Sequence, residues 1–314
     1  MSLAFIFPGQ GSQAIGMGAD LAEAFPAARE VFQEVDDALG QKLFALMTAG
    51  EIETLTLTEN AQPALMAVSM AVMRALESQF GVPVTKAAFV AGHSLGEYSA
   101  LAAAGAISLA DTARLLKRRG QAMQRAVPVG EGAMASLIGP KSDVSLAEAA
   151  AEAGSEVGVC VVANDNNAGN VVISGSKAAV DRAIEKAKAL RARAIPLNVP
   201  APLHCPLMQP AAAEMAEALA AAMIVQPRAP LVANVTAEPT HDPEAIRRML
   251  VEQVTGRVRW RESVEFLVGV GGVTRLAEAG AGKVLAGMVK RIAPDAEALS
   301  LNSPADLEAF AKSL

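Results

Sequence analysis

Histidine, cysteine and aromatic residues are scarce in this sequence, and each scarcity excludes a class of protein. Only 2 cysteines and 3 histidines occur among the 314 residues. Cys160 and Cys205 do not have the spacing of metal ligands, so we expect neither a zinc site nor a disulfide framework, and we expect a reducing, cytoplasmic location. Aromatic residues make up 4% of the chain, whereas hydrophobic residues, many of them alanine, make up 52%. This composition favours helix-rich layers with small side chains over an aromatic-rich β-sandwich.

Uninterrupted apolar runs and a basic N-terminus are also missing. Residues 1–19 carry no charge, but they have no Lys or Arg and are broken by Pro8 and Gly9, so they do not resemble a signal peptide. The uncharged segment 194–213 is long enough to cross a bilayer, yet it contains five prolines and cannot form a continuous helix. We therefore expect a soluble protein with no membrane partner.

The chain also lacks an excess of positive charge and a nucleotide-binding motif. The net charge of −6 argues against a nucleic-acid partner. Glycines 9, 11 and 16 do not form GxGxxG, and the segment 280–283 lacks the Ser or Thr of a P-loop, so we expect no cofactor. An acidic protein partner would need local basic clusters, for which the candidates are Lys117, Arg118, Arg191, Arg193, Lys290 and Arg291.

What the sequence contains is a pattern of apolar strands followed by turns and helices. Short apolar runs at 3–7 and 86–91 each lead into a glycine-bearing turn, and helical periodicity dominates between residues 20 and 80. Further core strands are expected at 227–234 and 273–277. This pattern is typical of an α/β protein, and the length favours two domains.

The middle of the chain has a different order of elements. Residues 129–199 read as strand, helix, strand, strand, helix and strand, which is the order of a ferredoxin-like unit. The expected ranges are 133–138, 145–153, 157–163, 170–174, 178–190 and 193–199. We therefore expect a large α/β-hydrolase-like subdomain with a parallel-sheet core, residues 1–128 and 200–314, and a small inserted ferredoxin-like subdomain, residues 129–199.

Ser94 lies in the segment Gly92-His93-Ser94-Leu95-Gly96, between an apolar strand and a helix. Glycines two positions either side of a serine are typical of a nucleophile elbow, a strained turn that presents the hydroxyl at a helix N-terminus. Free backbone N–H groups there, including that of Leu95, can face an oxyanion. The five-residue motif also recurs by chance, but its position between strand and helix favours catalysis.

A serine nucleophile needs a general base, and three histidines can supply one. His93 is adjacent to Ser94, where neighbouring side chains diverge, so we expect it to support the turn. His241 lies in a polar, proline-bounded turn that we expect to be exposed. His204 lies in a proline-rich loop where the two domains would meet, although a purely structural imidazole is an equally weighted alternative on these grounds.

The base would act without an adjacent acid. No Asp or Glu occurs between Glu185 and Glu214, so the sequence predicts a Ser-His dyad rather than a triad. A backbone carbonyl or an amide side chain would then fix the tautomer of His204.

Four segments, in order along the chain, resemble the malonyl-CoA:acyl-carrier-protein transacylase family, the acyltransferases of fatty-acid and polyketide synthesis. They are Phe7-Pro8-Gly9-Gln10-Gly11-Ser12-Gln13, the segment GHSLGEYSA at 92–100, Arg119-Gly120 with Met123, and His204-Cys205 with Leu207-Met208. The resemblance continues through Asn234-Val235, Gln253, Val258-Arg259-Trp260, Glu278, Gly280, Gly282 and Lys283-Val284-Leu285. It therefore covers essentially the whole chain.

The resemblance implies a role for each matching residue. Ser94 would be the acylated nucleophile and His204 its base. The backbone amides of Gln10 and Leu95 would form the oxyanion hole, with Gln10 also at the substrate. Arg119 would hold the malonyl carboxylate with its guanidinium fork; the alternative for a residue in the basic run 117–119 is a solvated helix face. Gln253 would hydrogen-bond in the active site and help to orient His204.

Two positions bear on acyl specificity in this family. The segment Ala201-Pro202-Leu203 before the histidine differs from the aromatic or serine-bearing sequences of many extender-selecting relatives, so it does not indicate one acyl group. Leu95 after the serine agrees with malonyl-specific relatives.

The implied reaction is a ping-pong transfer of malonyl from malonyl-CoA to the phosphopantetheine thiol of an acidic acyl carrier protein, by way of a malonyl-serine ester. A monomer is the default for a free-standing chain. The alternatives are a serine thioesterase or hydrolase, a polyketide acyltransferase with another extender unit, and a non-catalytic carrier-protein docking module. A hydrolase would normally have a late histidine, and none follows His241.

Overall fold

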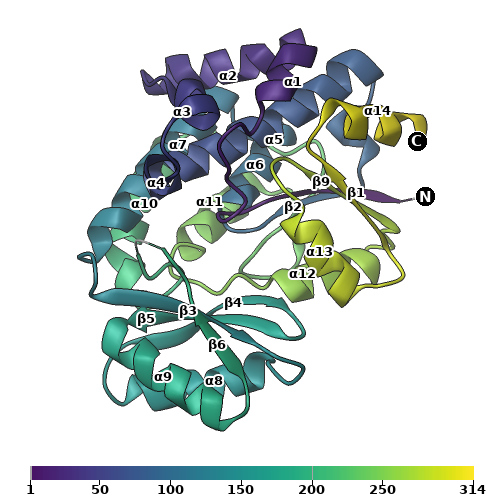
Figure 1. Cartoon of the computed structure of the whole chain (residues 1–314). Coiled ribbons are helices and arrows are strands. Elements are labelled where there is room, and N and C mark those ends of the chain that lie inside the picture. Colours follow the sequence, from purple (N-terminus) through teal and green to yellow (C-terminus); the bar gives the residue numbers. More distant parts are fainter. Residues whose placement is uncertain (1, 200) are drawn as a thin grey trace.

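Two separate β-sheets organise the chain in the computed structural model, which describes residues 2–199 and 201–314 (Figure 1). Met1 and Pro200, which open the two predicted segments of the large subdomain, lie outside the described residues. The larger sheet has six strands in the order β10-β9-β1-β2-β7-β8. These strands are β1 (Leu3–Phe7), β2 (Phe89–Gly92), β7 (Leu231–Val232), β8 (Pro239–Thr240), β9 (Arg275–Ala279) and β10 (Glu297–Leu301).

The larger sheet is parallel except where β7 pairs with β8. Every residue of β1 and β9 is buried, as expected for central parallel strands that are covered on both faces. The prediction of a strand at 227–234 is wrong in extent, because only residues 231–232 pair with β2. Pro227 and Pro230 have no N–H to donate to a ladder. Strands β8 and β10 were not predicted.

Fourteen α-helices occur in the described ranges, and they pack mainly around the larger sheet. They are α1 (Ala19–Ala24), α2 (Pro26–Leu39), α3 (Leu43–Ala49), α4 (Ile52–Thr56), α5 (Thr58–Phe80), α6 (Leu95–Ala103), α7 (Leu109–Ala126), α8 (Val144–Ser155), α9 (Lys177–Ala189), α10 (Gln209–Ala221), α11 (Pro243–Glu252), α12 (Trp260–Val268), α13 (Val284–Ile292) and α14 (Pro304–Lys312). Two 3₁₀ turns, Val84–Lys86 and Pro206–Met208, complete the set. None of the helices in these ranges has the length and apolar character needed to cross a membrane.

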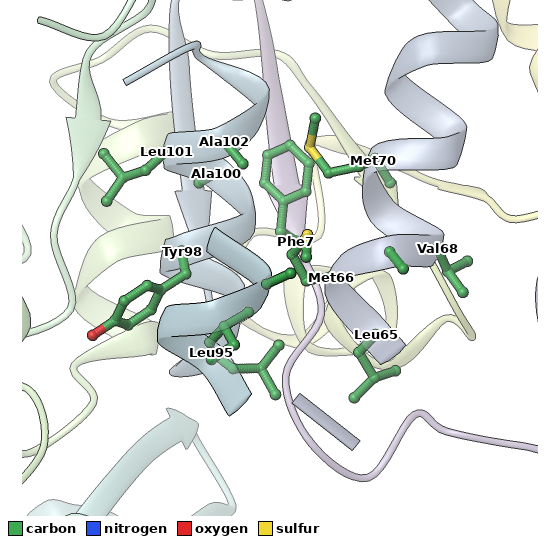
Figure 2. Packing of buried hydrophobic residues seen from close by; sticks show 14 of the residues in the cluster. Phe7, Leu65, Met66, Val68, Met70, Leu95, Tyr98, Ala100, Leu101 and Ala102 are labelled. Carbon is green, nitrogen blue, oxygen red and sulfur yellow. The ribbon is translucent and has the colours of Figure 1, made fainter. Parts of the chain in front are cut away.

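The predicted helical region 20–80 consists of five helices, α1 to α5. Pro26 starts α2 at a position where its missing N–H costs nothing, and Gly40 ends α2 with a left-handed φ of 58°. Helix α5 is buried along most of its length. Figure 2 shows its apolar side chains facing Phe7 of β1 and the first turns of α6. This packing fixes where α6 begins, and hence where Ser94 lies.

The second sheet has four antiparallel strands in the order β4-β5-β3-β6. Its strands are β3 (Gly132–Ile138), β4 (Cys160–Asn167), β5 (Asn170–Ser176) and β6 (Arg193–Pro196). Helices α8 and α9 cover one face and enclose a small alanine-rich core (Figure 1). The chain order β3-α8-β4-β5-α9-β6 is the predicted ferredoxin-like order, although β4 extends to 167 and β6 stops at 196. The limits 129 and 199 of an independent subdomain stay a prediction.

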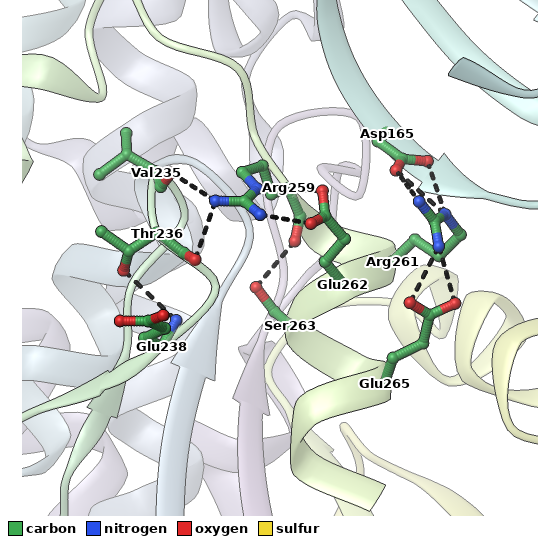
Figure 3. A network of polar contacts seen from close by, with 9 residues as sticks. All are labelled: Asp165, Val235, Thr236, Glu238, Arg259, Arg261, Glu262, Ser263 and Glu265. Atoms are coloured by element: carbon green, nitrogen blue, oxygen red, sulfur yellow. Dashed lines mark hydrogen bonds and ion pairs between the residues drawn. The ribbon is translucent and has the colours of Figure 1, made fainter. Parts of the chain in front are cut away.

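Strand β4 connects the small sheet to the rest of the molecule. The backbone N–H of Asp165 donates to the carbonyl of Val258 at 2.9 Å, and the N–H of Val258 donates to the carbonyl of Ala163 at 2.8 Å. Figure 3 shows the Asp165 carboxylate paired with Arg261, whose guanidinium also contacts Glu265. These contacts hold segment 257–261 against β4, close to Gln253 and Gly256.

Candidate active site

Ser94 lies at the junction of β2 and α6 in a strained conformation. Its φ of 55° and ψ of −111° fall outside the regions that residues with a side chain ordinarily adopt, a strain of about 1–3 kcal/mol. A Cβ on Gly92 would lie 1.9 Å from the carbonyl oxygen of Gly96, and a Cβ on Gly96 would lie 2.2 Å from that of Phe7. The two glycines are therefore required by the close approach of backbones, which brings Ser94 to the start of α6.

His204 contacts the serine hydroxyl directly. Its Nε2 is 2.8 Å from Ser94 Oγ, and its Nδ1 is 2.9 Å from the carbonyl oxygen of Gln253 and 3.2 Å from that of Gly256. Because carbonyl oxygens only accept, Nδ1 carries the proton and Nε2 is free to accept the proton of Ser94. Among the described residues, both acceptors at Nδ1 are backbone carbonyls. The sequence predicts either a backbone carbonyl or an amide side chain in this place.

The environment of His204 keeps the imidazole neutral. Burial lowers the pKa of His204 to about 3, and the nearby positive charge of Arg119 acts in the same direction. The imidazole is thus unprotonated at neutral pH, which is the state that a general base requires.

Arg119 is buried beside the serine. Its side chain is 1% exposed, and its Nη2 donates to Ser94 Oγ at 3.2 Å and to Gln253 Oε1 at 2.9 Å. Its Nη1 donates to Gln62 Oε1 at 2.8 Å, while Nε has no acceptor among the described residues. The alternative of a solvated face is wrong for Arg119. It applies to Arg118, which is 43% exposed and pairs with Glu214, whereas Lys117 is 21% exposed and pairs with Glu59.

Two backbone N–H groups in the segments next to the serine have no hydrogen-bond acceptor among the described residues. Within residues 2–199 and 201–314, neither the N–H of Gln10 nor that of Leu95 has an acceptor. The N–H of Ser94 itself is occupied, since it donates to Asn234 Oδ1 at 2.8 Å. Gln10 lies in the loop after β1 and Leu95 at the N-terminus of α6, so the pair can serve as an oxyanion hole.

A cavity of about 310 Å³ opens onto Ser94 and His204 between the two sheets. The small sheet contributes Met134, Asn164, Asn166 and Val172, and helix α13 contributes Val284, Leu285 and Met288. Gln10 lies on the wall of the same cavity. The volume of this cavity is at the lower end of the range for small-molecule sites.

The other two histidines lie where the sequence predicted. His241 is exposed. The Nε2 of His93 is 2.9 Å from Asn166 Oδ1 of the small sheet, and its ring lies 5.8 Å from that of Trp260, while the residue also lines the cavity at Ser94. Burial lowers the pKa of His93, so it is a neutral structural group.

Several buried polar residues around Ser94 were not singled out from the sequence for their roles. Glu97 is 1% exposed and accepts from Gln253 Nε2 at 2.7 Å. Asn234 bridges Ser94 N and Gly92 O, and Gln62 holds Arg119. Glu97 and Asn234 both lie in segments that carry the family resemblance, which was the available signal, but only the fold brings them together.

The chain resembles known proteins in its sequence and in its structure. Residues 4–273 match the acyl transferase domain family. The malonyl CoA-acyl carrier protein transacylase of Escherichia coli K12 is 47% identical over 98% of this chain and 97% of its own length, and that of Bacillus subtilis 168 is 43% identical over 98% and 95%. The crystal structure of an acyl-carrier-protein-S-malonyltransferase from Bartonella henselae is 55% identical and superposes with a TM-score of 0.96 over 100% of this chain and 99% of that one.

A further solved structure contains a partner. It is a complex of a type II polyketide acyl-carrier protein with its malonyl-transacylase, and it is 42% identical to this chain, with a TM-score of 0.96 and 100% coverage of both chains.

Proposed function

The chain belongs to the acyl transferase family, among the malonyl-CoA:acyl-carrier-protein transacylases, and on that premise we propose that its malonyl transfer proceeds through an ester on Ser94. It is an acyltransferase that takes malonyl from malonyl-CoA to acyl carrier protein and so supplies fatty-acid synthesis. The observation that carries the proposed mechanism is the 2.8 Å contact between Ser94 Oγ and His204 Nε2, beside a buried arginine.

In the first step Ser94 Oγ attacks the thioester carbonyl and His204 Nε2 takes its proton. The tetrahedral oxyanion is stabilised by the backbone N–H groups of Gln10 and Leu95. Collapse of the intermediate breaks the carbon–sulfur bond, and His204 returns the proton to the departing thiolate of coenzyme A. In the second step His204 takes the proton of the carrier protein's thiol, which attacks the serine ester, and Ser94 Oγ leaves with that proton.

Arg119 selects the acyl group in this proposal. The malonyl carboxylate lies one methylene beyond the ester carbonyl, and the guanidinium is 3.2 Å from Ser94 Oγ with Nε unused. A buried arginine pays a desolvation cost that a carboxylate partner offsets, whereas an acetyl group offers none.

The carrier protein's docking face, a cytoplasmic location and a monomeric state are parts of the same proposal. Of the predicted basic residues, Lys117 and Arg118 are engaged with Glu59 and Glu214. Lys290 and Arg291 are exposed on α13, the helix whose Val284, Leu285 and Met288 line the cavity, and form no ion pair within the described part of the chain. Cys160 and Cys205 are buried free thiols, as a reducing compartment permits.

Labelled malonyl-CoA distinguishes this function from its alternatives. With acyl carrier protein present, we expect the label on the carrier protein, and without it a stable malonyl-enzyme. Release of free malonate would instead indicate a thioesterase, and no reaction would indicate a docking module. A preference for a branched acyl-CoA would indicate a polyketide acyltransferase with another extender unit.

A further inference from the structure

Glu97 is a buried acid to which the mechanism above gives no part. It lies one turn after Ser94 on α6, and burial raises its pKa to about 7. A carboxylate in such a place is costly unless its oxygens are hydrogen-bonded. Its Oε2 accepts from Gln253 Nε2 at 2.7 Å and from the N–H of Asn234 at 3.2 Å, whereas Oε1 has no partner in the described ranges.

Gln253 stands between Glu97 and Arg119. Its Nε2 donates to Glu97, and its Oε1 accepts from Arg119 Nη2 at 2.9 Å. A glutamine amide can be turned by 180°, which exchanges its donor and its acceptor. Here the turned amide would place its N–H groups against the N–H groups of Arg119 and its oxygen against Glu97 Oε2. Glu97, Arg119 and the carbonyl oxygen of Ser94 therefore permit only one orientation, and Glu97 makes the shortest of these contacts with the amide.

The orientation of Gln253 matters because this residue contacts three groups of the site. Besides Arg119, its Nε2 donates to the carbonyl oxygen of Ser94 at 2.9 Å, and its own carbonyl oxygen accepts from His204 Nδ1 at 2.9 Å. Removal of the Glu97 contact would leave the amide nitrogen of Gln253 with the Ser94 carbonyl and Asn234 Oδ1 as its acceptors. The amide would lose its shortest hydrogen bond, and with it part of its hold on Arg119 Nη2. The carbonyl contact with His204 belongs to the backbone and would persist.

We propose that Glu97 is a positioning residue that, by fixing the Gln253 amide, holds the Arg119 guanidinium in place and thereby sets the preference for acyl groups that carry a carboxylate. This inference rests on the proposed function. Misplacement of a binding group by a fraction of an ångström lowers the rate with the substrate that needs it, so malonyl transfer depends on Glu97 and acetyl transfer does not.

In this proposal Glu97 acts through the hydrogen bonds that its Oε2 accepts, and not through its negative charge. A proton added to Glu97 would occupy the unpartnered Oε1 and leave Oε2 free to accept both hydrogen bonds. The variant Glu97→Gln reproduces that state, with its amide nitrogen in place of Oε1. The variant Glu97→Asp keeps the charge but withdraws the carboxylate by one methylene from Gln253 Nε2.

The test measures acyl-enzyme formation from malonyl-CoA and from acetyl-CoA, and compares the ratio of the two kcat/KM values. We expect the malonyl-to-acetyl ratio to fall about 10-fold in Glu97→Asp, as for loss of one hydrogen bond to a charged group, and to stay within about 3-fold of wild type in Glu97→Gln. The reverse order would overturn the proposal in favour of a role for charge. An equal fall with both substrates would overturn it in favour of a merely structural role.

Two controls separate this effect from others. Glu278 of β9 is also fully buried and accepts from the N–H groups of Leu285 and Ala286 at 3.1 and 2.8 Å. Glu278→Asp shortens the side chain of a matched buried acid by one methylene. It should lower the melting temperature without changing the malonyl-to-acetyl ratio of kcat/KM. In a Gln253→Ala background, Glu97→Asp should have no further effect on the ratio, and an additive loss would contradict action through Gln253.

The same experiment tests the proposed function itself when it is first carried out with the wild-type protein. If wild-type protein forms no malonyl ester on Ser94, the proposed mechanism fails. If it forms one and the Glu97 variants behave otherwise than expected, only the further inference fails.

Discussion

At the scale of single residues, the proposed function assigns the distinction between malonyl and acetyl to Arg119. We expect Arg119→Ala to lower kcat/KM for malonyl-CoA by about 100-fold, equivalent to two hydrogen bonds between charged groups, and to lower that for acetyl-CoA by less than about 10-fold. Steady-state kinetics with both thioesters measure this. Arg118, its half-exposed neighbour on α7, provides the control, since Arg118→Ala should leave the ratio unchanged. Equal losses with both substrates in Arg119→Ala would remove its role as the carboxylate-binding group.

The low pKa of His204 predicts an unusual pH dependence. An imidazole with a pKa of about 3 does not gain a proton as pH falls from 8 to 5, whereas a free histidine does so near 6.5. The rate of malonyl-enzyme formation should therefore show no loss assignable to His204 in this range. Stopped-flow measurements across the range would check it. A fall in rate with a midpoint near 6.5 would show that the histidine is more exposed to water than the structure has it.

The same pKa has a consequence for stability. The unfolded chain binds a proton at His204 below about pH 6.5, and the folded protein does not, so this histidine makes unfolding more favourable as pH falls below that value. The buried base is thus maintained at a cost that other parts of the fold offset.

The sequence identified some residues of the site and not others, for physical reasons. Ser94 is recognisable because its turn needs glycines at fixed spacing, and His204 because the chain has only three histidines. Glu97 was not predicted to act, because its partner Gln253 lies 156 residues away in the chain. A contact of that separation is created by the fold, and no local pattern records it.

At the scale of elements, the junction of β2 and α6 depends on two backbones that almost touch. We expect Gly96→Ala to destabilise the protein by about 3 kcal/mol or more, because the new methyl group would meet the carbonyl of Phe7. Urea unfolding measures the effect. Gly287→Ala on the exposed side of α13 is the matched control, since nothing lies within 4 Å of its Cβ position, and it should stabilise the protein by about 0.5–1 kcal/mol. Equal stabilities for the two variants would contradict the close approach.

The elements themselves were predicted unevenly. The fully apolar β1 was expected at its observed limits, because five buried residues in a row are typical of a central parallel strand. The helix after Ser94 was expected directly behind the serine turn, and it begins at Leu95. Ser94 with Glu97 three residues later has the spacing of a helix N-terminus, and the first turn packs against Phe7 and α5 (Figure 2).

At the scale of the whole molecule, the active-site cavity exists because β4 of the small sheet is fixed to segment 257–261. Asp165 is 1% exposed and pairs at 2.8 Å with Arg261, which is 30% exposed, so Asp165→Asn should destabilise the protein by about 2 kcal/mol, the size of a hydrogen bond to a charged group. Arg261 also pairs with Glu265, which is 50% exposed, and Glu265→Gln should cost less than about 1 kcal/mol. Thermal unfolding of the two variants makes the comparison. A Glu265 variant as unstable as the Asp165 variant would show that the buried pair does not secure the small sheet.

The ferredoxin-like order of the small sheet was predictable from alternating strands and helices, but its docking was not. The only bridge between β4 and the segment beyond α11 in the described residues is a parallel one from Asn164 to Val258. Such a bridge joins positions 94 residues apart and has no signature in either segment.

Intact mass spectrometry after brief exposure to malonyl-CoA, without acyl carrier protein, tests the Ser94 mechanism most directly. Wild-type protein should gain the mass of one malonyl group, and Ser94→Ala should gain none while it retains the wild-type melting temperature. A malonyl adduct on a folded Ser94→Ala protein would place the nucleophile elsewhere and contradict the mechanism.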